Sequence, residues 1–424
     1  MHFIYLLICT AQTLAHFHLC KHFAKQETHM LTQDVIDTVK STAPLLAKEG
    51  EGITRLFYAK LFENHPELQH VFNMANQAQG DQPRALAESV FKYASHIDQL
   101  QELGPLVKRI AHKHASLSVS PEQYPIVGKY LLEAIGEHLS LEPDHPVISA
   151  WAVAYGQLAD IFVSTEEQIY SDNANKVGGW RGFREFVISK IVNEAEGVNS
   201  FYLTPADNGE IATFEPGQYV GVKVKAPHGG YDEIRQYSLS AAPGEAFYRI
   251  TVKSEAMLIS QPGLVSNYLH SAKVGDQLLL QPPTGDFVVA RPEKDIVLIA
   301  GGVGITPLLS MLLARIGTTK TGEGITFIKC CRDENHHIMK DELRNLSEQY
   351  GFNYKVAYEF GNGADHQGYL DAAVLNDWLK NREADVYFCG PRPFMNALDK
   401  LLGTIGYAES QRHYEVFGAG TRLN

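Results

Sequence analysis

Residues 295–312 constrain the fold of this chain more than any other stretch, because they contain a short apolar run, a glycine turn and a helix start in sequence. The run from 296 to 299 is too short for a helix and is typical of a buried strand. The turn is rich in glycine, which lets a backbone pass close to something bulky; its glycines are Gly301, Gly302 and Gly304. Thr306 is placed to cap the following helix, with Pro307 at its first position. Such a helix start suits a phosphate, although an ordinary strand-to-helix turn would look similar, because this is not the common GxGxxG pattern.

A second strand end supports the nucleotide interpretation. Residues 385–395 contain another apolar strand, which ends in Cys389, Gly390 and Pro391. From 295 onward strands alternate with helices, and this alternation predicts a parallel sheet covered on both faces. Together the two stretches resemble the nicotinamide half of the ferredoxin-reductase family, and the resemblance implies that both strand ends line an NAD(P)H site.

The sequence before residue 295 has two further patterns. From 30 to about 170 apolar residues recur at helical spacing and strand signals are almost absent; the expected helices span 32–46, 53–62, 86–97, 103–117, 124–139 and 147–161. Beyond 180, short β-rich runs broken by Pro and Gly indicate a small antiparallel barrel; the expected strands span 183–192, 200–204, 218–224, 237–241, 248–252 and 277–281. We therefore expect an all-α domain at 30–170, an antiparallel β-barrel at 180–291 and an α/β domain at 295–424.

Net charge and cysteine spacing limit the binding partners and the cellular compartment that we expect for this protein. Lys and Arg number 37 against 49 Asp and Glu, a net charge of −12, and no basic block stands out. This balance argues against nucleic acid and anionic membrane surfaces. The five cysteines have no metal-ligand or disulfide-framework spacing, which fits a reducing compartment, so we expect a cytoplasmic protein.

The first 29 residues differ from the rest of the chain. Their apolar patch is too interrupted for a membrane span, and they lack the basic start and cleavage site of a good signal peptide. We expect this N-terminal extension to be an over-long start assignment, with a secretory signal as the alternative, and we expect no integral membrane span.

Helical spacing places one histidine on an apolar face. Val107, Ile110, His114 and Leu117 form one stripe, whereas His112 falls on the opposite, polar side. A lone histidine on an apolar face is more often a hydrogen-bonded core residue than a ligand. Spacing alone does not decide between the two.

Four segments of the helical part resemble globins of the flavohaemoglobin family: FYAKLFENHPELQHVFNMANQ, GDQPRAL, AHKHAS and PEQYPIVG. The resemblance implies a haem b domain, with His114 as the proximal iron ligand and with Phe72 and Lys113 near the cofactor. It also implies a distal side, matched by Tyr58, Gln82 and Leu86. A distal phenol can donate a hydrogen bond to the partly anionic bound oxygen.

The resemblance also places a pair of residues beside the proximal histidine. Tyr124 and Glu166 match this pair, and neighbouring Glu167 is the alternative in register. A carboxylate there would make the imidazole a stronger electron donor. Without the resemblance, the two would be a half-buried tyrosine and a surface carboxylate.

The barrel carries the RxYS pattern of the ferredoxin-reductase family, which implies an FAD site; its residues are Arg235, Gln236, Tyr237 and Ser238. In that family the arginine meets the flavin pyrophosphate and the tyrosine packs on the isoalloxazine, as suits a cation and an aromatic face. Tyr219, in the upstream segment PGQY, matches a second flavin contact. Val265 and Ser266 match an element that offers backbone N–H groups near the phosphates.

The α/β domain supplies the remaining cofactor residues that the resemblance implies. The nicotinamide nucleotide would lie along Gly302, Val303, Gly304, Ile305, Thr306 and Pro307, opposite Cys389, Gly390 and Pro391. Near the end of the chain, a segment matches the part of the family that closes over the flavin; its residues are Glu415, Val416, Phe417, Gly418 and Ala419.

The resemblance covers residues 30–424 and implies a nitric oxide dioxygenase. In that family NAD(P)H reduces FAD, FAD reduces haem b, and haem-bound O₂ oxidises nitric oxide to nitrate. An oxygen-binding or oxygen-sensing globin with a fused reductase would use the same residues. A general flavin reductase with a degraded globin is a third alternative, which the presence of His114, Tyr58 and Gln82 argues against. We expect a monomer whose partners are O₂ and nitric oxide, and no residue stands out that would select NADPH over NADH.

Overall fold

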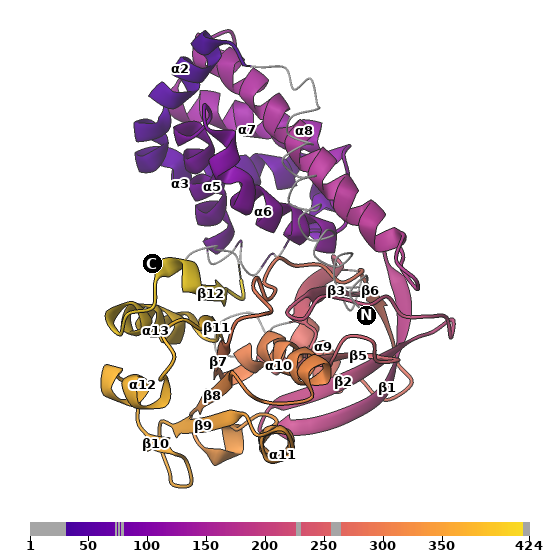
Figure 1. Ribbon diagram of the computed structural model, residues 1–424. Coiled ribbons are helices and arrows are strands. Elements are labelled where there is room, and N and C mark those ends of the chain that lie inside the picture. Colours follow the sequence, from indigo (N-terminus) through magenta and orange to yellow (C-terminus); the bar gives the residue numbers. More distant parts are fainter. Residues whose placement is uncertain are drawn as a thin grey trace, which may run out of the picture.

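The computed structural model describes residues 31–72, 74, 77, 80–225, 230–255 and 264–418. Figure 1 shows a bundle of helices above two other bodies, a curled antiparallel sheet and a parallel sheet flanked by helices. The order of the three bodies along the chain is the expected one. The expected extension at 1–29 and the expected flavin contact Ala419 lie outside the described residues.

The first body is all helix. Its elements are α2 (Gln33–Ser41), α3 (Ala43–Asn64), η1 (Pro66–His70), α5 (Asp81–Ser95), η2 (Leu100–Leu103), α6 (Gly104–Ser116), α7 (Gln123–Leu139) and α8 (Pro146–Ala174). The expected single helix at 32–46 is wrong, because the structure divides it between α2 and α3 at Thr42. Pro44 explains the break, since a residue without an N–H cannot continue the helix but is tolerated in the first turn of a new one.

The second body is a six-stranded antiparallel sheet. Its strands are β1 (Arg184–Ala195), β2 (Val198–Pro205), β3 (Tyr219–Val224), β4 (Glu233–Ser238), β5 (Tyr248–Lys253) and β6 (Gln277–Leu280). The strand order is β4-β3-β6-β1-β2-β5, and an antiparallel bridge between Leu239 and Ile250 joins the two edges into a barrel. Helix α9 (Leu264–Ser271) lies against β3, β4 and β5.

One strand of the barrel is displaced from its expected position. The strand expected at 237–241 is β4, which begins at Glu233 and ends at Ser238. Its polar residues Arg235 and Gln236 line a cavity rather than the barrel core, so apolar patterning does not reveal them.

The third body is a six-stranded parallel sheet with the order β10-β9-β8-β7-β11-β12. Its strands are β7 (Ile296–Gly301), β8 (Ile325–Cys331), β9 (Asn353–Tyr358), β10 (His366–Gln367), β11 (Asp385–Cys389) and β12 (Arg412–Glu415). Its helices are η4 (Gly302–Gly304), α10 (Ile305–Thr319), η5 (Glu334–His336), α11 (Lys340–Tyr350), α12 (Ala372–Trp378), α13 (Arg392–Thr404) and η6 (Glu409–Gln411). Alternate residues of β7 pack into two cores, one under α10 and α11 and one under α12 and α13, so helices cover both faces as expected.

The turn after β7 is tighter than the sequence suggests. A Cβ on Gly304 would lie 2.2 Å from the carbonyl oxygen of Cys389, so the bulky neighbour of this turn is the backbone that follows β11. The expectation that Thr306 caps the helix is wrong. Helix α10 begins at Ile305, and the Thr306 hydroxyl donates to the Val303 carbonyl at 3.2 Å. The helix can begin early because Pro307 then lies in the first turn, where a missing N–H costs nothing.

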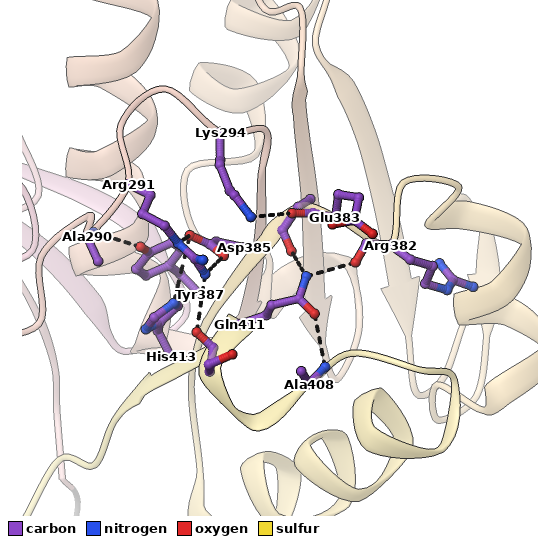
Figure 2. Close-up of polar contacts among 12 residues, drawn as sticks. Ala290, Arg291, Lys294, Arg382, Glu383, Asp385, Tyr387, Ala408, Gln411 and His413 are labelled. Carbon is purple, nitrogen blue, oxygen red and sulfur yellow. Dashed lines mark hydrogen bonds and ion pairs between the residues drawn. The ribbon is translucent and has the colours of Figure 1, made fainter.

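Figure 2 shows how the linker from the barrel to the third body is fixed. Asp385 in β11 is fully buried, and both of its oxygens accept hydrogen bonds from the Arg291 guanidinium, one of them at 2.7 Å from Nε. The backbone N–H of Ala290 donates to the Tyr387 hydroxyl at 2.8 Å. These contacts hold the linker against the strand that ends beside the glycine turn.

A second arginine joins the same two bodies at another place. Arg249 in β5 is buried, and its guanidinium donates to both oxygens of Glu342 in α11 at 2.9 and 3.1 Å. The same guanidinium also donates to the Ser240 carbonyl. Because paired, parallel contacts of this kind restrict rotation, the barrel and the parallel sheet are held in one relative orientation.

Two helical stretches of the described chain are long and apolar enough to cross a bilayer by length and composition alone, namely α8 and Gly302–Thr319. Core helices of folded domains meet the same test, and 56% of the Gly302–Thr319 window is buried. The expectation of no integral membrane span stays a prediction.

Candidate functional site

A cavity of about 1090 Å³ runs between the three bodies. Side chains from α3, α5, α6, α7 and α8 line its helical end, and residues of β3, β4, β12 and the glycine turn line the other end. Most of the expected site residues lie on its wall: Tyr58, Phe72, Gln82, Leu86, Lys113, His114, Tyr124, Tyr219, Arg235, Gln236, Tyr237, Ser238, Val265, Ser266, Val303, Thr306, Glu415, Val416, Phe417 and Gly418. The site is therefore one continuous space with contributions from every domain.

The proximal side is a hydrogen-bonded triad. His114 Nδ1 lies 2.7 Å from Glu166 Oε1 and 3.1 Å from the Tyr124 hydroxyl, which itself donates to Glu166 at 2.5 Å. Glu166 is only 2% exposed, and burial together with this carboxylate raises the pKa of the Tyr124 phenol, which stays protonated. With Nδ1 engaged, Nε2 is the ring nitrogen left for an iron.

The side chains of the neighbouring residues Glu166 and Glu167 contact different partners in the structure. Glu167 points away from the cavity and pairs with Arg181, with oxygen-to-nitrogen distances of 2.7 and 2.8 Å. Glu166, and not Glu167, is therefore the carboxylate beside His114. One residue of helix rotates a side chain by about 100°, so only one of two adjacent glutamates can face inward.

The distal side is mostly apolar, and Tyr58 and Gln82 are among its polar residues. Tyr58 is buried, and its ring packs edge-on against Phe72 with the centroids 5.7 Å apart. Burial raises the pKa of the Tyr58 phenol, while a hydrogen bond with the Gln82 side chain opposes the rise. Gln82 Oε1 is buried and lacks a hydrogen-bond partner among the described residues. An apolar slot with a histidine on one side and an orphaned polar atom within it fits a haem and a small ligand.

The flavin side is formed by two paired strands. Tyr219 of β3 pairs with Ser238 of β4, which brings Tyr219 close to the RxYS residues. The Arg235 guanidinium forms an ion pair with Glu233, with a nitrogen-to-oxygen distance of 2.6 Å, and donates to the Ile234 carbonyl at 2.8 Å; both partners lie in its own strand. A cation on the cavity wall beside two aromatic rings fits a pyrophosphate and an isoalloxazine.

The nicotinamide residues divide into two groups. Val303 and Thr306 lie on the cavity wall. Cys389 is fully buried behind the turn, where its thiol donates to the Glu415 carbonyl at 3.4 Å and burial raises its pKa. Gly304 and Gly390 let the two strand ends approach, since a Cβ on Gly390 would lie 3.0 Å from the Gly301 Cα. Packing of the two turns accounts for these glycines and for the cysteine.

A group of charges lies where the helical domain meets the last strand. Lys113 Nζ donates to the Gly418 carbonyl at 2.6 Å. Burial raises the pKa of Glu415 to about 8, with Asp286 adding to the rise and Lys113 and Arg109 opposing it. Sequence reasoning missed Arg109 and Asp286, whose side chains are 3.5 Å apart, because neither belongs to a motif.

Helix α6 makes the seam between the helical domain and the barrel, as Figure 1 shows. The Gly285 N–H donates to His112 Nδ1 at 3.1 Å, and the Gln236 amide donates to the Ser116 hydroxyl at 3.1 Å. A Cβ on Gly221 would lie 2.3 Å from the Ser116 carbonyl oxygen. The element that carries His114 therefore lies directly on strands β3 and β4.

Comparisons with known families match each body separately. A globin model matches residues 55–162, an oxidoreductase FAD-binding domain matches 185–289, and an oxidoreductase NAD-binding domain matches 298–400. These matches confirm the expected fold class. The chain is an oxidoreductase that binds haem, FAD and a nicotinamide nucleotide.

Whole-chain relatives are called flavohemoproteins. The proteins of Oceanobacillus iheyensis and Rhizobium meliloti are each 44% identical to this chain over 92% of its length, covering 97% and 98% of their own. A solved flavohemoglobin of Malassezia yamatoensis with bound FAD and heme has a TM-score of 0.81 at 26% identity, covering 92% of this chain and all of that one. The FAD/NAD-binding domain of a nitric oxide dioxygenase of Vibrio cholerae has a TM-score of 0.52 at 39% identity, covering 56% of this chain and all of that domain.

Proposed function

Because the chain belongs to the flavohemoprotein family, we propose that it is a nitric oxide dioxygenase that uses NAD(P)H and O₂ to convert nitric oxide to nitrate. The observation that carries the proposal is the continuous cavity, which has the His114 triad and Tyr58 at one end and the glycine turn at the other. A globin that only stores or senses oxygen has less need of a reductase in the same space.

When bound, the nicotinamide nucleotide, FAD and haem would supply hydride transfer, single-electron transfer and activation of O₂, respectively. The polypeptide aligns them. In our proposal Arg235 holds the flavin pyrophosphate, Tyr219 and Tyr237 hold its ring, and Val303 and Thr306 receive the nicotinamide nucleotide.

The proximal residues hold one tautomer of His114. Glu166 accepts from Nδ1–H, so the proton stays on that atom and Nε2 keeps its lone pair for the iron. The Tyr124 phenol donates to the same carboxylate oxygen and restrains it from rotating. A carboxylate that partly accepts the proton of an imidazole makes the ring a stronger electron donor, which favours oxygen activation.

The distal residues hold a proton donor in a dry pocket. Tyr58 stays protonated across the physiological pH range because burial raises its pKa. Its hydroxyl can therefore donate to an oxygen that carries negative charge. Gln82, whose Oε1 has no partner among the described residues, orients this phenol in our proposal.

The setting of the reaction is also part of the proposal. We propose that the protein acts in the cytoplasm as a monomer. Its net charge of −12 disfavours binding to nucleic acid. Its cysteines lack the spacing of a disulfide framework, which favours a reducing compartment.

An electrode measurement of nitric oxide tests the proposal. In air-saturated buffer, haem- and FAD-loaded protein should consume nitric oxide rapidly only when NADH or NADPH is present, with nitrate as the product. His114→Ala, as a control, should lose this activity while NAD(P)H still reduces its FAD. Slow loss of nitric oxide despite normal haem reduction would contradict the proposal and favour an oxygen-binding globin.

A further inference from the structure

His112 lies in the segment AHKHAS, but the resemblance gives it no role, and in the structure it bridges two domains. It lies in α6, two residues before His114, and its ring faces the barrel rather than the interior of the helical domain. Its Nδ1 accepts a hydrogen bond from the Gly285 N–H at 3.1 Å. A backbone N–H can only donate, so this ring nitrogen is the acceptor and the contact has one direction.

The barrel turn that His112 holds is itself attached to a flavin-facing residue. The backbones of Thr284 and Tyr219 exchange two hydrogen bonds, at 2.8 and 2.9 Å. Gly285 has a left-handed backbone with φ +127°, and a Cβ there would lie 3.0 Å from the Tyr219 ring. A displacement of this turn would therefore move Tyr219 as well.

We propose that His112 is a positioning residue for electron transfer from flavin to haem: it fixes the Thr284–Gly285 turn, and with it Tyr219, against the helix that carries His114. The inference rests on the proposed placement of FAD beside Tyr219 and of haem on His114. His112 is not among the described residues that line the cavity, so it acts through the turn and not by touching either group.

The size of the expected effect follows from the sensitivity of redox partners to alignment. A misplacement of about 1 Å can cost up to about 100-fold in rate. The Gln236–Ser116 contact also crosses this seam, so loss of one contact should not separate the domains. We expect a partial loss of roughly 10-fold in the flavin-to-haem rate, within the range that such misplacement produces.

Two substitutions separate the hydrogen bond from the bulk of the ring. His112→Leu removes the acceptor nitrogen and replaces the ring with an apolar side chain of similar length. His112→Asn keeps an acceptor oxygen one bond from Cγ, as Nδ1 is in histidine, so it is the matched control. Both variants should carry the same haem and FAD content as the unmodified protein.

Anaerobic rapid mixing with NADH follows flavin bleaching and ferrous haem formation in one experiment. We expect His112→Leu to reduce its flavin at the unmodified rate and its haem about 10-fold more slowly. We expect His112→Asn to recover most of the haem rate. Equal haem rates in the unmodified protein and His112→Leu, or equal slowing in His112→Leu and His112→Asn, would overturn the proposal.

Hydrogen–deuterium exchange on the holoprotein gives a readout that does not depend on turnover. The Gly285 amide should exchange faster in His112→Leu than in the unmodified protein, and it should stay protected in His112→Asn. Unchanged protection in His112→Leu would also overturn the proposal. Failure of the dioxygenase proposal is distinguishable, because it would show as absent nitric oxide consumption with a normal rate of haem reduction.

Discussion

Glu166 is the buried carboxylate on the proximal side of the pocket, and both His114 and Tyr124 form hydrogen bonds to its Oε1. Glu166→Gln keeps the shape but removes the charge, so the imidazole becomes a weaker donor to the iron. We expect the haem midpoint potential to rise and nitric oxide turnover to fall by about 10- to 100-fold, the usual cost of losing such a partner. A spectroelectrochemical titration measures the potential. Glu167→Gln is the matched control and should leave it unchanged; equal potentials in both variants would contradict the role of Glu166.

Tyr58 is the donor that we expect to retain oxygen. Tyr58→Phe removes a hydrogen bond to a charged oxygen worth about 1.5–3 kcal/mol, so O₂ should dissociate about 10- to 100-fold faster. Rapid mixing of the oxygenated protein with carbon monoxide measures this rate. Tyr170→Phe, which loses a bond to the Val119 carbonyl instead, is the control. An off-rate in Tyr58→Phe that matches this control would exclude Tyr58 as the donor.

Glu415 links stability to pH in the cofactor-free chain. Its pKa is raised from 4.5 to about 8 by burial, so the folded chain binds this proton more tightly than the unfolded chain. The stability linked to it is complete below the unfolded value and is lost as pH rises through the folded one. We expect the melting temperature of the apoprotein to fall between about pH 4.5 and about pH 8 and to level off above that, and we expect Glu415→Gln to flatten the slope. The same slope in both proteins would show that other groups set it.

At the scale of elements, the turn between β7 and α10 depends on close packing against the end of β11. Gly304→Ala places a methyl group 2.2 Å from the Cys389 carbonyl oxygen, so the turn must move. We expect weaker NADH binding, measured from the NADH dependence of the flavin-reduction rate. Gly317→Ala, inside α10, meets no atom within 4 Å and should leave binding unchanged while adding about 0.5–1 kcal/mol of stability. Equal NADH affinity in both variants would contradict this account.

Elements with a clear apolar periodicity were predictable from the sequence, whereas the residues at which they begin and end were not. Helices α6, α7 and α8 follow their apolar stripes. Pro44 divides one expected helix, because the same residue is permitted at a helix start and forbidden in its interior. Strand β4 escapes an apolar pattern because its polar residues line the cavity. The deviation at β4 therefore falls at the cavity, where ligands and not side chains are expected to fill the space.

At the scale of the whole molecule, motif order predicted the three domains, but no local pattern predicted how they meet. Arg249 and Glu342 are 93 residues apart in sequence and form one ion pair between two domains. His112 and Gly285 are 173 residues apart. Such contacts have no periodicity or composition of their own, so only the folded chain reveals them.

In the proposed function, this cavity brings together electrons, O₂ and nitric oxide, and both atoms of O₂ enter one product. Isotope labelling tests this: ¹⁸O₂ and NADH are supplied to the loaded protein, nitric oxide is added, and the nitrogen oxides are analysed by mass spectrometry. We expect nitrate in which two of the three oxygen atoms carry the label. Nitrite, nitrous oxide, or nitrate with one labelled atom or none would contradict it.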